Sequence, residues 1–519
     1  MEYSKENEHK ENEIYQKLES NKLLFYEKIT NNKIFKDFPI NEKEKECFST
    51  IMSILKKNNL TSIICRVVGG WVRDKLLGKE SDDIDIVIND MPASEFTLLI
   101  NQELYTGKLK MGIIPKNLAK GKLIEVATTN IFNTQIDIVN LRNNDQNQIP
   151  TPLSDALRRD LSINSLFYNI NEEKVEDFSG RGIKDLEQGI IDTPIEAEIA
   201  LRDDSFIVLR MLRFAIKYKF KISNDINNYI EKNRDYIISN FYKKVSKERI
   251  EKELFKILKL ENSRYAIAYF YNFNILDIII LIKNYDKENN YDKIFLKATN
   301  LYILGEYLLE KNKIFDIEMN SDNFNKVNYS LLLLTLYFRD KKDKNVYINQ
   351  KILKHTYRTS NENQRANSYM CRNFDELLKI INEGNYERLK IAKIIKKINS
   401  KNIIPCLFAC IAYEYIENVE LISLLYEIDE NILQKFIDKI KKFFDYIIKE
   451  DLLYIEKMKV LIDGKELKEI LNIKLTKEVG TLIEYLIDEQ IRNPKLNREQ
   501  AIELLKKKKE EISFKNKDN

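Results

Sequence analysis

The 519-residue sequence has few of the residues on which several common kinds of site depend. Its two histidines, His9 and His355, are too few for a histidine-rich zinc centre and make a serine-protease triad hard to assemble. Its five cysteines lack the spacing of zinc sites, since the pair Cys406 and Cys410 encloses three residues instead of two. Any metal chemistry is therefore expected to use oxygen ligands.

Glycine and proline are also scarce, at 13 and 8 residues, which argues against a loop-rich all-β protein and favours long helices. The length exceeds what one hydrophobic core usually holds, so several domains are expected. No apolar run approaches the roughly 18 residues that span a bilayer, so a soluble protein without membrane contact is expected. Because 85 Lys and Arg nearly balance 81 Asp and Glu, a nucleic-acid surface would have to be local.

The start of the chain is polar. Residues 1–20 are rich in Glu and Lys and contain no apolar stretch, so no secretory signal is expected. Residues 1–45 are predicted to be a polar extension without a function of its own. We expect a cytoplasmic protein and leave nuclear or organellar residence open; nothing in the sequence sets the oligomeric state.

Residues 46–192 are predicted to form an α/β domain. Helical stretches such as residues 94–104 alternate there with short β-branched runs, which cover residues 64–68, 84–88, 123–128 and 136–141. After about residue 193 the strand signals fade and helical periodicity continues, with similar apolar spacing over residues 301–309, 331–336 and 452–471. One clear apolar stripe consists of Ile250, Leu254, Ile257 and Leu258. Without a fixed repeat period, an irregular helical array is expected.

The first candidate site combines a glycine pair with two aspartates. A β-run ends in Gly69 and Gly70 and leads into a helix-compatible segment with Arg73, so backbone amides and a cation can approach a phosphate. In the following strand, Asp83 and Asp85 lie two residues apart and point to the same face. Such carboxylates repel unless a cation lies between them, and Mg²⁺ ordinarily bridges carboxylates to substrate phosphates. The alternative is a solvent-facing acidic strand edge, and we favour the Mg²⁺ site.

A third acid often completes such a cage. Two later strand segments offer Glu125 and Asp137. We favour Glu125 as the third catalytic acid, although either carboxylate could instead be a charge at a strand edge.

An arginine-rich segment provides the second candidate site. Arg158 and Arg159 precede Asp160 and Asn164, so guanidinium groups for phosphates stand near polar groups for ribose hydroxyls. The alternative is a capped, salt-bridged surface helix, because arginine pairs are common on surfaces. We favour nucleotide binding by Arg159, Asp160 and Asn164.

A third segment is helical and carries spaced charges. Arg210 and Arg213 are three residues apart and so lie on one helix face, with Asp204 about two turns earlier. This face is predicted to contact a nucleobase; a salt-bridged surface face is the alternative.

The order of these motifs resembles motifs A to E of the class II tRNA nucleotidyltransferases, the family of CCA-adding enzymes and poly(A) polymerases. The matching segments are Gly-Gly-Trp-Val-Arg-Asp with Asp83 and Asp85, then Arg-Arg-Asp at residues 158–160, then residues 177–186, 203–214 and 246–258. The match covers residues 67–258. Residues 124–128 and 136–142 resemble the eukaryotic branch in particular.

The resemblance implies an α/β nucleotidyltransferase head followed by an all-α neck, body and tail in an elongated, seahorse-like architecture. The implied bounds are residues 46–192, 193–260, 261–400 and 401–519, with tRNA bound by the tail. It also implies template-independent addition of CCA to the 3′ end of tRNA from CTP and ATP, by two-metal transfer with pyrophosphate release. The alternatives are a poly(A) polymerase, an enzyme that adds only CC or only A, and a non-catalytic RNA-binding relative.

The resemblance also implies residue roles. Asp83 and Asp85 would hold Mg²⁺, and the nucleotide would be bound by Gly69, Gly70, Arg73, Arg159, Asp160, Asn164, Asp204, Arg210 and Arg213. In this family the base is selected mainly by an Asp and an Arg three residues later. Here the later position is Ile207, which cannot donate a hydrogen bond. The sequence leaves open whether base selection is altered or depends on Arg210 or Arg213.

Overall fold

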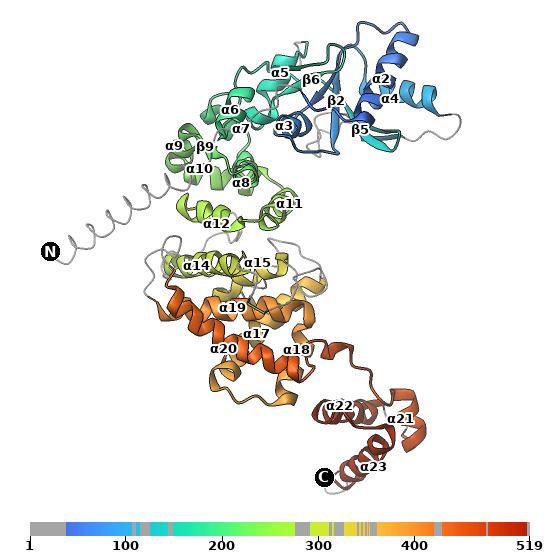
Figure 1. The fold of residues 1–519 in the computed structure, drawn as a ribbon, viewed down its shortest axis with the longest axis vertical. Coiled ribbons are helices and arrows are strands. Elements are labelled where there is room, and N and C mark those ends of the chain that lie inside the picture. Colours follow the sequence, from blue (N-terminus) through green and yellow to red (C-terminus); the bar gives the residue numbers. More distant parts are fainter. Residues whose placement is uncertain are drawn as a thin grey trace, which may run out of the picture. The chain divides into compact units, whose positions relative to one another are not determined.

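A computed structural model gives the fold as two compact units, Met1–Glu261 and Asn262–Asn519 (Figure 1). The residues it describes are 38–105, 111–114, 125–143, 149–275, 291–310, 314–315, 326–339, 342–343, 346–347, 350, 352, 361–419, 428–473 and 476–515.

The first unit is built on a seven-stranded sheet of order β3-β4-β5-β2-β1-β6-β7. Its strands are β1 (Cys65–Val68), β2 (Ile84–Ile88), β3 (Met111–Ile114), β4 (Val126–Ile131), β5 (Thr134–Asn140), β6 (Phe167–Asn169) and β7 (Lys174–Glu176). The β2–β5 pair is parallel and the other pairs are antiparallel. The four runs predicted from the sequence correspond to β1, β2, β4 and β5. The other three strands, of three or four residues each, were not predicted from the sequence.

The two faces of this sheet differ in character. On one face, Ile86 and Ile138 are buried, and Thr129 accepts a hydrogen bond of 2.8 Å from Asn101. Asn101 belongs to α4 (Ala93–Leu104), which covers this face with α2 (Glu42–Lys57), as Figure 1 shows. Because side chains alternate along a strand, the neighbours of these residues point to the opposite face, and Asp85 is among them.

Helix α2 begins inside the segment predicted as a polar extension. Asn41 caps it, and Glu44 is buried, where it accepts a hydrogen bond of 2.9 Å from Trp71 Nε1 and pairs with Lys75 at 2.9 Å. Phe38 stacks on Tyr168 with ring centroids 4.8 Å apart. The folded head therefore includes residues 38–45, and the predicted boundary at residue 46 is too late.

Helices make up most of the rest of the first unit. They are α3 (Gly70–Leu76), α5 (Pro152–Leu157), α6 (Gly182–Gln188), α7 (Ala197–Asp203), α8 (Ile207–Tyr218), α9 (Asn224–Lys232), α10 (Arg234–Lys244) and α11 (Lys247–Leu258), with a 3₁₀ turn at Ser162–Asn164. The predicted apolar stripe of α11 is buried. The neck is not wholly helical, because β9 (Lys221–Ile222) pairs in parallel with β8 (Ile190–Ile191).

The second unit is largely helical. It contains α12 (Ser263–Asn272), α14 (Tyr291–Glu310), α15 (Lys326–Thr335), α17 (Asn361–Glu383), α18 (Arg388–Ile398), α19 (Ser400–Asn418), α20 (Glu430–Lys449), α21 (Gly464–Leu471), α22 (Thr476–Arg492) and α23 (Arg498–Lys515), with 3₁₀ turns at Leu336–Phe338 and Ile455–Lys457. A two-stranded sheet of β10 (Lys342–Asp343) and β11 (Val346–Tyr347) departs from the all-α expectation.

Two sequence expectations about this unit are corrected. The predicted helical spacing over residues 452–471 is interrupted by the 3₁₀ turn, and only α21 follows as a helix. The predicted division at residue 400 falls between α18 and α19, which pack against each other. A separate small core forms later, where Leu467, Leu482 and Leu505 of α21, α22 and α23 are buried together.

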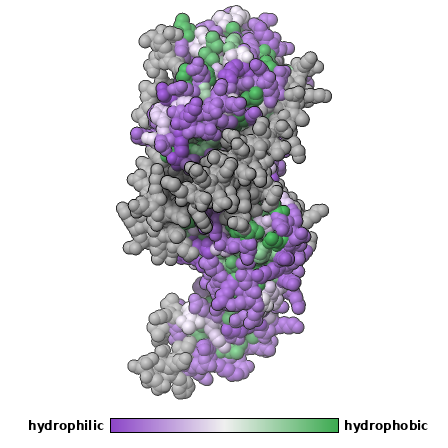
Figure 2. All heavy atoms as spheres, turned by 90° about the vertical axis from the view of Figure 1, so that its left-hand side faces the viewer, coloured by the Kyte–Doolittle hydropathy of each residue, from purple (hydrophilic) through white to green (hydrophobic). Residues whose placement is uncertain are grey.

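The surface of the described residues is predominantly polar. On the face drawn in Figure 2, hydrophilic side chains dominate and hydrophobic ones form small separate patches. Among the helices that the structure describes, none combines the length and apolar character needed to cross a bilayer.

Helix α8 ends in a left-handed residue that is not glycine. Lys219 has φ of 59°, and the backbone N–H of Phe220 donates to the carbonyl of Ala215 at 2.9 Å, as in a Schellman cap. This conformation costs an L-residue about 1–2 kcal/mol. We therefore expect Lys219→Gly to raise the free energy of unfolding by about 0.5 kcal/mol, after the extra unfolded-state entropy of glycine is subtracted. The midpoint of urea unfolding measures the change.

The control for this variant is Lys252→Gly on the exposed side of α11, where the backbone is right-handed. It is expected to lower the free energy of unfolding by about 1 kcal/mol. Equal destabilisation by both substitutions would show that Lys219 carries no backbone strain.

Candidate functional site

The register of the sheet brings the glycine pair beside the aspartates. In the antiparallel β1–β2 pair, Val67 lies opposite Ile86, so one step further along the register places Val68 beside Asp85. Gly69 follows Val68 with φ of 74°, in the region that favours glycine. The turn into α3 therefore begins at the edge of the sheet face that carries Asp85.

The structure brings Asp83, Asp85 and Asp137 together. Asp83 immediately precedes β2, and Asp85 lies directly across from Asp137 in the parallel β2–β5 pair. The Asp85 side chain remains open to solvent, yet desolvation by the surrounding protein raises its pKa to about 6, with further increases from Asp137 and Asp83. Arg159 and Arg142 act in the opposite direction. Desolvation and the neighbouring carboxylates disfavour the charged form of Asp85, and a divalent cation would favour it.

The preference for Glu125 as the third acid is corrected. Glu125 Oε1 accepts a hydrogen bond of 3.0 Å from the backbone N–H of Ser94 in the first turn of α4. Helix α4 covers the opposite face of the sheet, so Glu125 serves this helix and not the aspartate pair. Asp137, the other candidate, lies in register with Asp85 and accepts a hydrogen bond of 2.7 Å from Thr128.

The donor set suits an ion that arrives with its own oxygen ligands. In the described part of the chain, no three His, Cys, Asp or Glu side chains are placed to hold a metal ion by themselves. Mg²⁺ is usually bound by one or two carboxylates together with substrate phosphates and water. Asp83 and Asp85 fit that pattern, because they provide charge and oxygen atoms without enclosing the site.

Arg159 lies against the glycine turn. A Cβ on Gly69 would lie 3.2 Å from Nη1 of Arg159, closer than side chains normally approach. The fully buried Asp155 accepts hydrogen bonds from Nη2 and Nε of Arg159 at 2.7 and 3.1 Å and is also paired with Arg142. Burial alone would raise the pKa of Asp155, but the two guanidinium groups outweigh it and lower the pKa. Arg159 is thus held in place beside Gly69.

A chain of hydrogen bonds and ion pairs connects α3 to α8. Arg73 donates to Asn164 Oδ1, and Asn164 Nδ2 donates to Asp160 Oδ1 at 3.1 Å. Asp160 Oδ2 pairs with Arg210 Nη2 at 2.9 Å. Asp74 accepts hydrogen bonds from Arg73 Nε at 3.0 Å and from the Tyr218 hydroxyl at 2.6 Å. The predicted residues Arg73, Asn164, Asp160 and Arg210 therefore form one connected group.

The expected contact between Arg73 and a triphosphate is not supported by its surroundings. Arg73 is 3% exposed, and its guanidinium lies 4.7 and 4.8 Å from the ring centroids of Phe214 and Tyr218. With Asp74 and Asn164 on its polar edge, this guanidinium is fully enclosed. Arg73 therefore positions Asn164 and fixes α3 against α8.

The residues of the helix face that is predicted to contact a nucleobase differ in their surroundings. Arg213 pairs with the buried Glu253 of α11, and its guanidinium stacks 4.0 Å from the Phe214 ring. Ile207, at the start of α8, is buried, with only 7% of its surface exposed. Asp204 remains half exposed at the end of α7.

One neighbour of Asp204 was missed in the sequence. Arg249 Nη2 of α11 lies 3.6 Å from Asp204 Oδ2. The two residues are separated by 45 positions, and no local spacing rule links them. The sequence marks Arg249 only through the Ser-Lys-Glu-Arg-Ile segment, which resembles a motif of the family.

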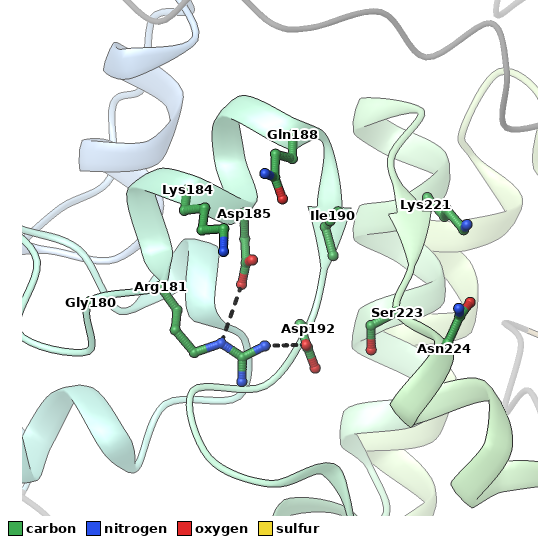
Figure 3. Close-up of a pocket in the computed structure, with 10 residues that line it drawn as sticks. All are labelled: Gly180, Arg181, Lys184, Asp185, Gln188, Ile190, Asp192, Lys221, Ser223 and Asn224. Atoms are coloured by element: carbon green, nitrogen blue, oxygen red, sulfur yellow. Dashed lines mark hydrogen bonds and ion pairs between the residues drawn. The ribbon is translucent and has the colours of Figure 1, made fainter.

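A separate cavity of about 360 Å³ lies between α6, β8, β9 and α9. Figure 3 shows the Arg181 guanidinium held by Asp185 and Asp192 on one side, with Ser223 and Lys221 across from them. Asp83, Asp85, Gly69 and Gly70 do not line it. In the segment 177–186, Asp177 accepts hydrogen bonds from the backbone N–H groups of Gly180 and Ile183, which shapes the turn into α6.

Comparisons with known proteins agree with these observations. Residues 65–192 match the family model described as the poly A polymerase head domain. A mitochondrial CCA tRNA nucleotidyltransferase of Candida glabrata is 28% identical over 492 residues, covering 85% of this chain and 90% of that protein. The protein of the same name from Saccharomyces cerevisiae is 28% identical over 496 residues, covering 86% of this chain and 89% of that protein.

The fold also matches solved structures. The Thermotoga maritima CCA-adding enzyme complexed with tRNA aligns with a TM-score of 0.59 over 90% of this chain and 95% of that chain, at 20% identity. That identity supports the fold alone. Over the head domain, and over most of its length, the chain is therefore similar to the tRNA nucleotidyltransferases and poly(A) polymerases.

Proposed function

We propose that this protein adds CCA to the 3′ end of tRNA, without a template, from CTP and ATP. The observation that carries the proposal is the pair Asp83 and Asp85 beside the glycine turn at Gly69, on a head of the nucleotidyltransferase family. Relatives named for this activity match the chain over most of its length, and a solved relative is complexed with tRNA.

Asp83 and Asp85 are the residues that would hold divalent metal, which enzymes of this family use, and we propose Mg²⁺. When bound, the ions neutralise the triphosphate and favour in-line attack by the tRNA 3′-hydroxyl with release of pyrophosphate. Asp137 adds negative charge behind Asp85. The proposed metal site thus depends on the carboxylates that β2 and β5 bring together.

The remaining residues bind and orient the nucleotide. Arg159 is placed for phosphate, because Asp155 of α5 fixes its guanidinium beside Gly69, where α3 begins. Asp160 and Asn164 present polar groups suited to ribose hydroxyls. Arg210 pairs with Asp160 and Arg213 pairs with Glu253. These two arginines therefore position the nucleotide-binding residues.

The wider organisation is also proposed. Residues up to 192 form the head and residues 193–260 the neck, while the second unit supplies the body and the tail, of which the tail binds tRNA. The mitochondrial names of two relatives leave cytoplasmic, nuclear or organellar residence to be determined by localisation of the full chain.

Ile207 stands where the family carries an arginine. For this reason two related activities remain as alternatives, poly(A) synthesis and the addition of CC or A alone. The length of the product on a sequencing gel separates them. Three added nucleotides support CCA addition, and a long adenosine tail or a product that stops early contradicts it.

Removal of either aspartate is expected to abolish the reaction. In Asp85→Asn or Asp83→Asn, incorporation of labelled CTP into tRNA that ends before CCA should fall by about 10³-fold, since metal stabilisation of the transition state is worth several kcal/mol. Initial rates at saturating Mg²⁺ measure the effect.

Asp82→Asn is the matched control, because it removes the adjacent exposed carboxylate outside the pair. Its rate should stay within about threefold of the wild type, an exposed charge being worth at most about 1 kcal/mol. Full activity of Asp85→Asn would contradict the proposed site.

The raised pKa of Asp85 predicts a pH dependence. Protons and metal compete for this carboxylate, so the half-saturating Mg²⁺ concentration should rise as pH falls below about 6, by about tenfold per pH unit. In Asp137→Asn one of the repelling charges is lost, which lowers the pKa of Asp85 and moves this rise to lower pH. Rates over a Mg²⁺ series from pH 5 to 8, about the range in which a group of pKa near 6 titrates, measure it.

Asp82→Asn is again the control, since Asp137 and Asp83 are the carboxylates that raise the pKa of Asp85 most. It should leave the pH midpoint unchanged. A midpoint that does not move in Asp137→Asn would refute the electrostatic coupling between the two strands.

A further inference from the structure

Asp204 presents an acceptor of fixed direction. Its Oδ1 accepts a hydrogen bond of 3.0 Å from the backbone N–H of Phe206, which holds the carboxylate at the junction of α7 and α8. The side chain is nevertheless 45% exposed. Its second oxygen therefore faces a region that a ligand can enter.

Arg249 places a donor beside that acceptor from another helix. Ser246 caps α11, and Arg249 lies in the first turn. Its guanidinium lies 4.3 Å from the Phe206 ring centroid, so its plane is supported by stacking, and Nη2 is 3.6 Å from Asp204 Oδ2. That distance is longer than a hydrogen bond, and Arg249 is 53% exposed. The two side chains are therefore oriented toward each other, but this distance leaves both able to bind a ligand.

The other cations near this surface are engaged elsewhere. Arg210 pairs with Asp160, and Arg213 pairs with the buried Glu253. Ile207 offers no donor. Of these side chains, Arg249 is the one whose guanidinium adjoins Asp204.

The chemistry of the two substrates fits such a pair. Cytosine and adenine each present an exocyclic amine next to an unprotonated ring nitrogen, whereas uracil and guanine present a carbonyl next to a ring N–H. A carboxylate accepts from the amine, and a guanidinium donates to the ring nitrogen. The reversed pattern of uracil and guanine would face like groups, acceptor to acceptor and donor to donor.

We propose that Arg249, together with Asp204, determines base specificity by donating to the ring nitrogen of the incoming CTP or ATP. This inference rests on the proposed function and assigns to α11 the donor that Ile207 cannot supply from α8. The stacking of Arg249 on Phe206 keeps the donor plane fixed for both bases.

The test compares the four nucleoside triphosphates. Purified full-length wild type, Arg249→Gln and Arg249→Lys receive tRNA ending before CCA or after CC, Mg²⁺ and one triphosphate at a time. Arg249→Gln is expected to lower the kcat/KM ratios of CTP over UTP and of ATP over GTP by about 10- to 100-fold. Arg249→Lys keeps the charge but not the fork, so it should also lose discrimination.

Arg202→Gln is the matched control. Arg202 on α7 is 60% exposed and pairs with Glu198 at 3.1 Å, so it is as exposed as Arg249 but belongs to a different pair. Its nucleotide ratios should remain within about threefold of the wild type, because an exposed pair contributes at most about 1 kcal/mol.

Each outcome decides the inference. Loss of discrimination in both Arg249 variants with the control unchanged supports it. Unchanged ratios, or an equal loss for all four triphosphates with a lowered thermal midpoint, overturn it and assign Arg249 a structural role. A wild type that adds no nucleotide overturns the proposed function itself, which separates the two failures.

Discussion

The buried guanidinium of Arg73 is the interaction on which the rest of the site depends. A charge removed from water is tolerated only with full compensation, and here Asp74, Asn164 and the faces of Phe214 and Tyr218 supply it. Because these partners come from α3, the 3₁₀ turn and α8, one cation fixes three elements against each other. The nucleotide surface inherits its shape from that constraint.

The aspartates differ from Arg73, because their negative charge is only partly balanced by neighbouring cations. Asp85 faces Asp137 across parallel strands, and Arg159, which acts most strongly against that repulsion, is already bound to Asp155. Desolvation and repulsion leave the pKa of Asp85 at about 6. Cations that arrive with a polyphosphate would balance this negative charge. Such cations can leave with the product, so the site is free for the next nucleotide.

The surface that we propose contacts the base combines side chains from separate helices. Ile207 offers no hydrogen-bond donor from α8 and packs as a buried core residue. Arg249 reaches the same carboxylate from α11, supported by the ring of Phe206. The position of α11 is fixed by the buried Arg213–Glu253 pair, so the donor depends on packing between helices.

The sequence by itself determined the elements and the short-range chemistry. Alternation and helical spacing predicted β1, β2, α4 and α11, and the two-residue spacing set Asp83 and Asp85 together, because these are properties of one strand or helix. Tertiary structure alone decided between Glu125 and Asp137, enclosed Arg73, and brought Arg249 to Asp204. Those outcomes depend on strand register and on contacts between residues far apart in the chain, which no local pattern encodes.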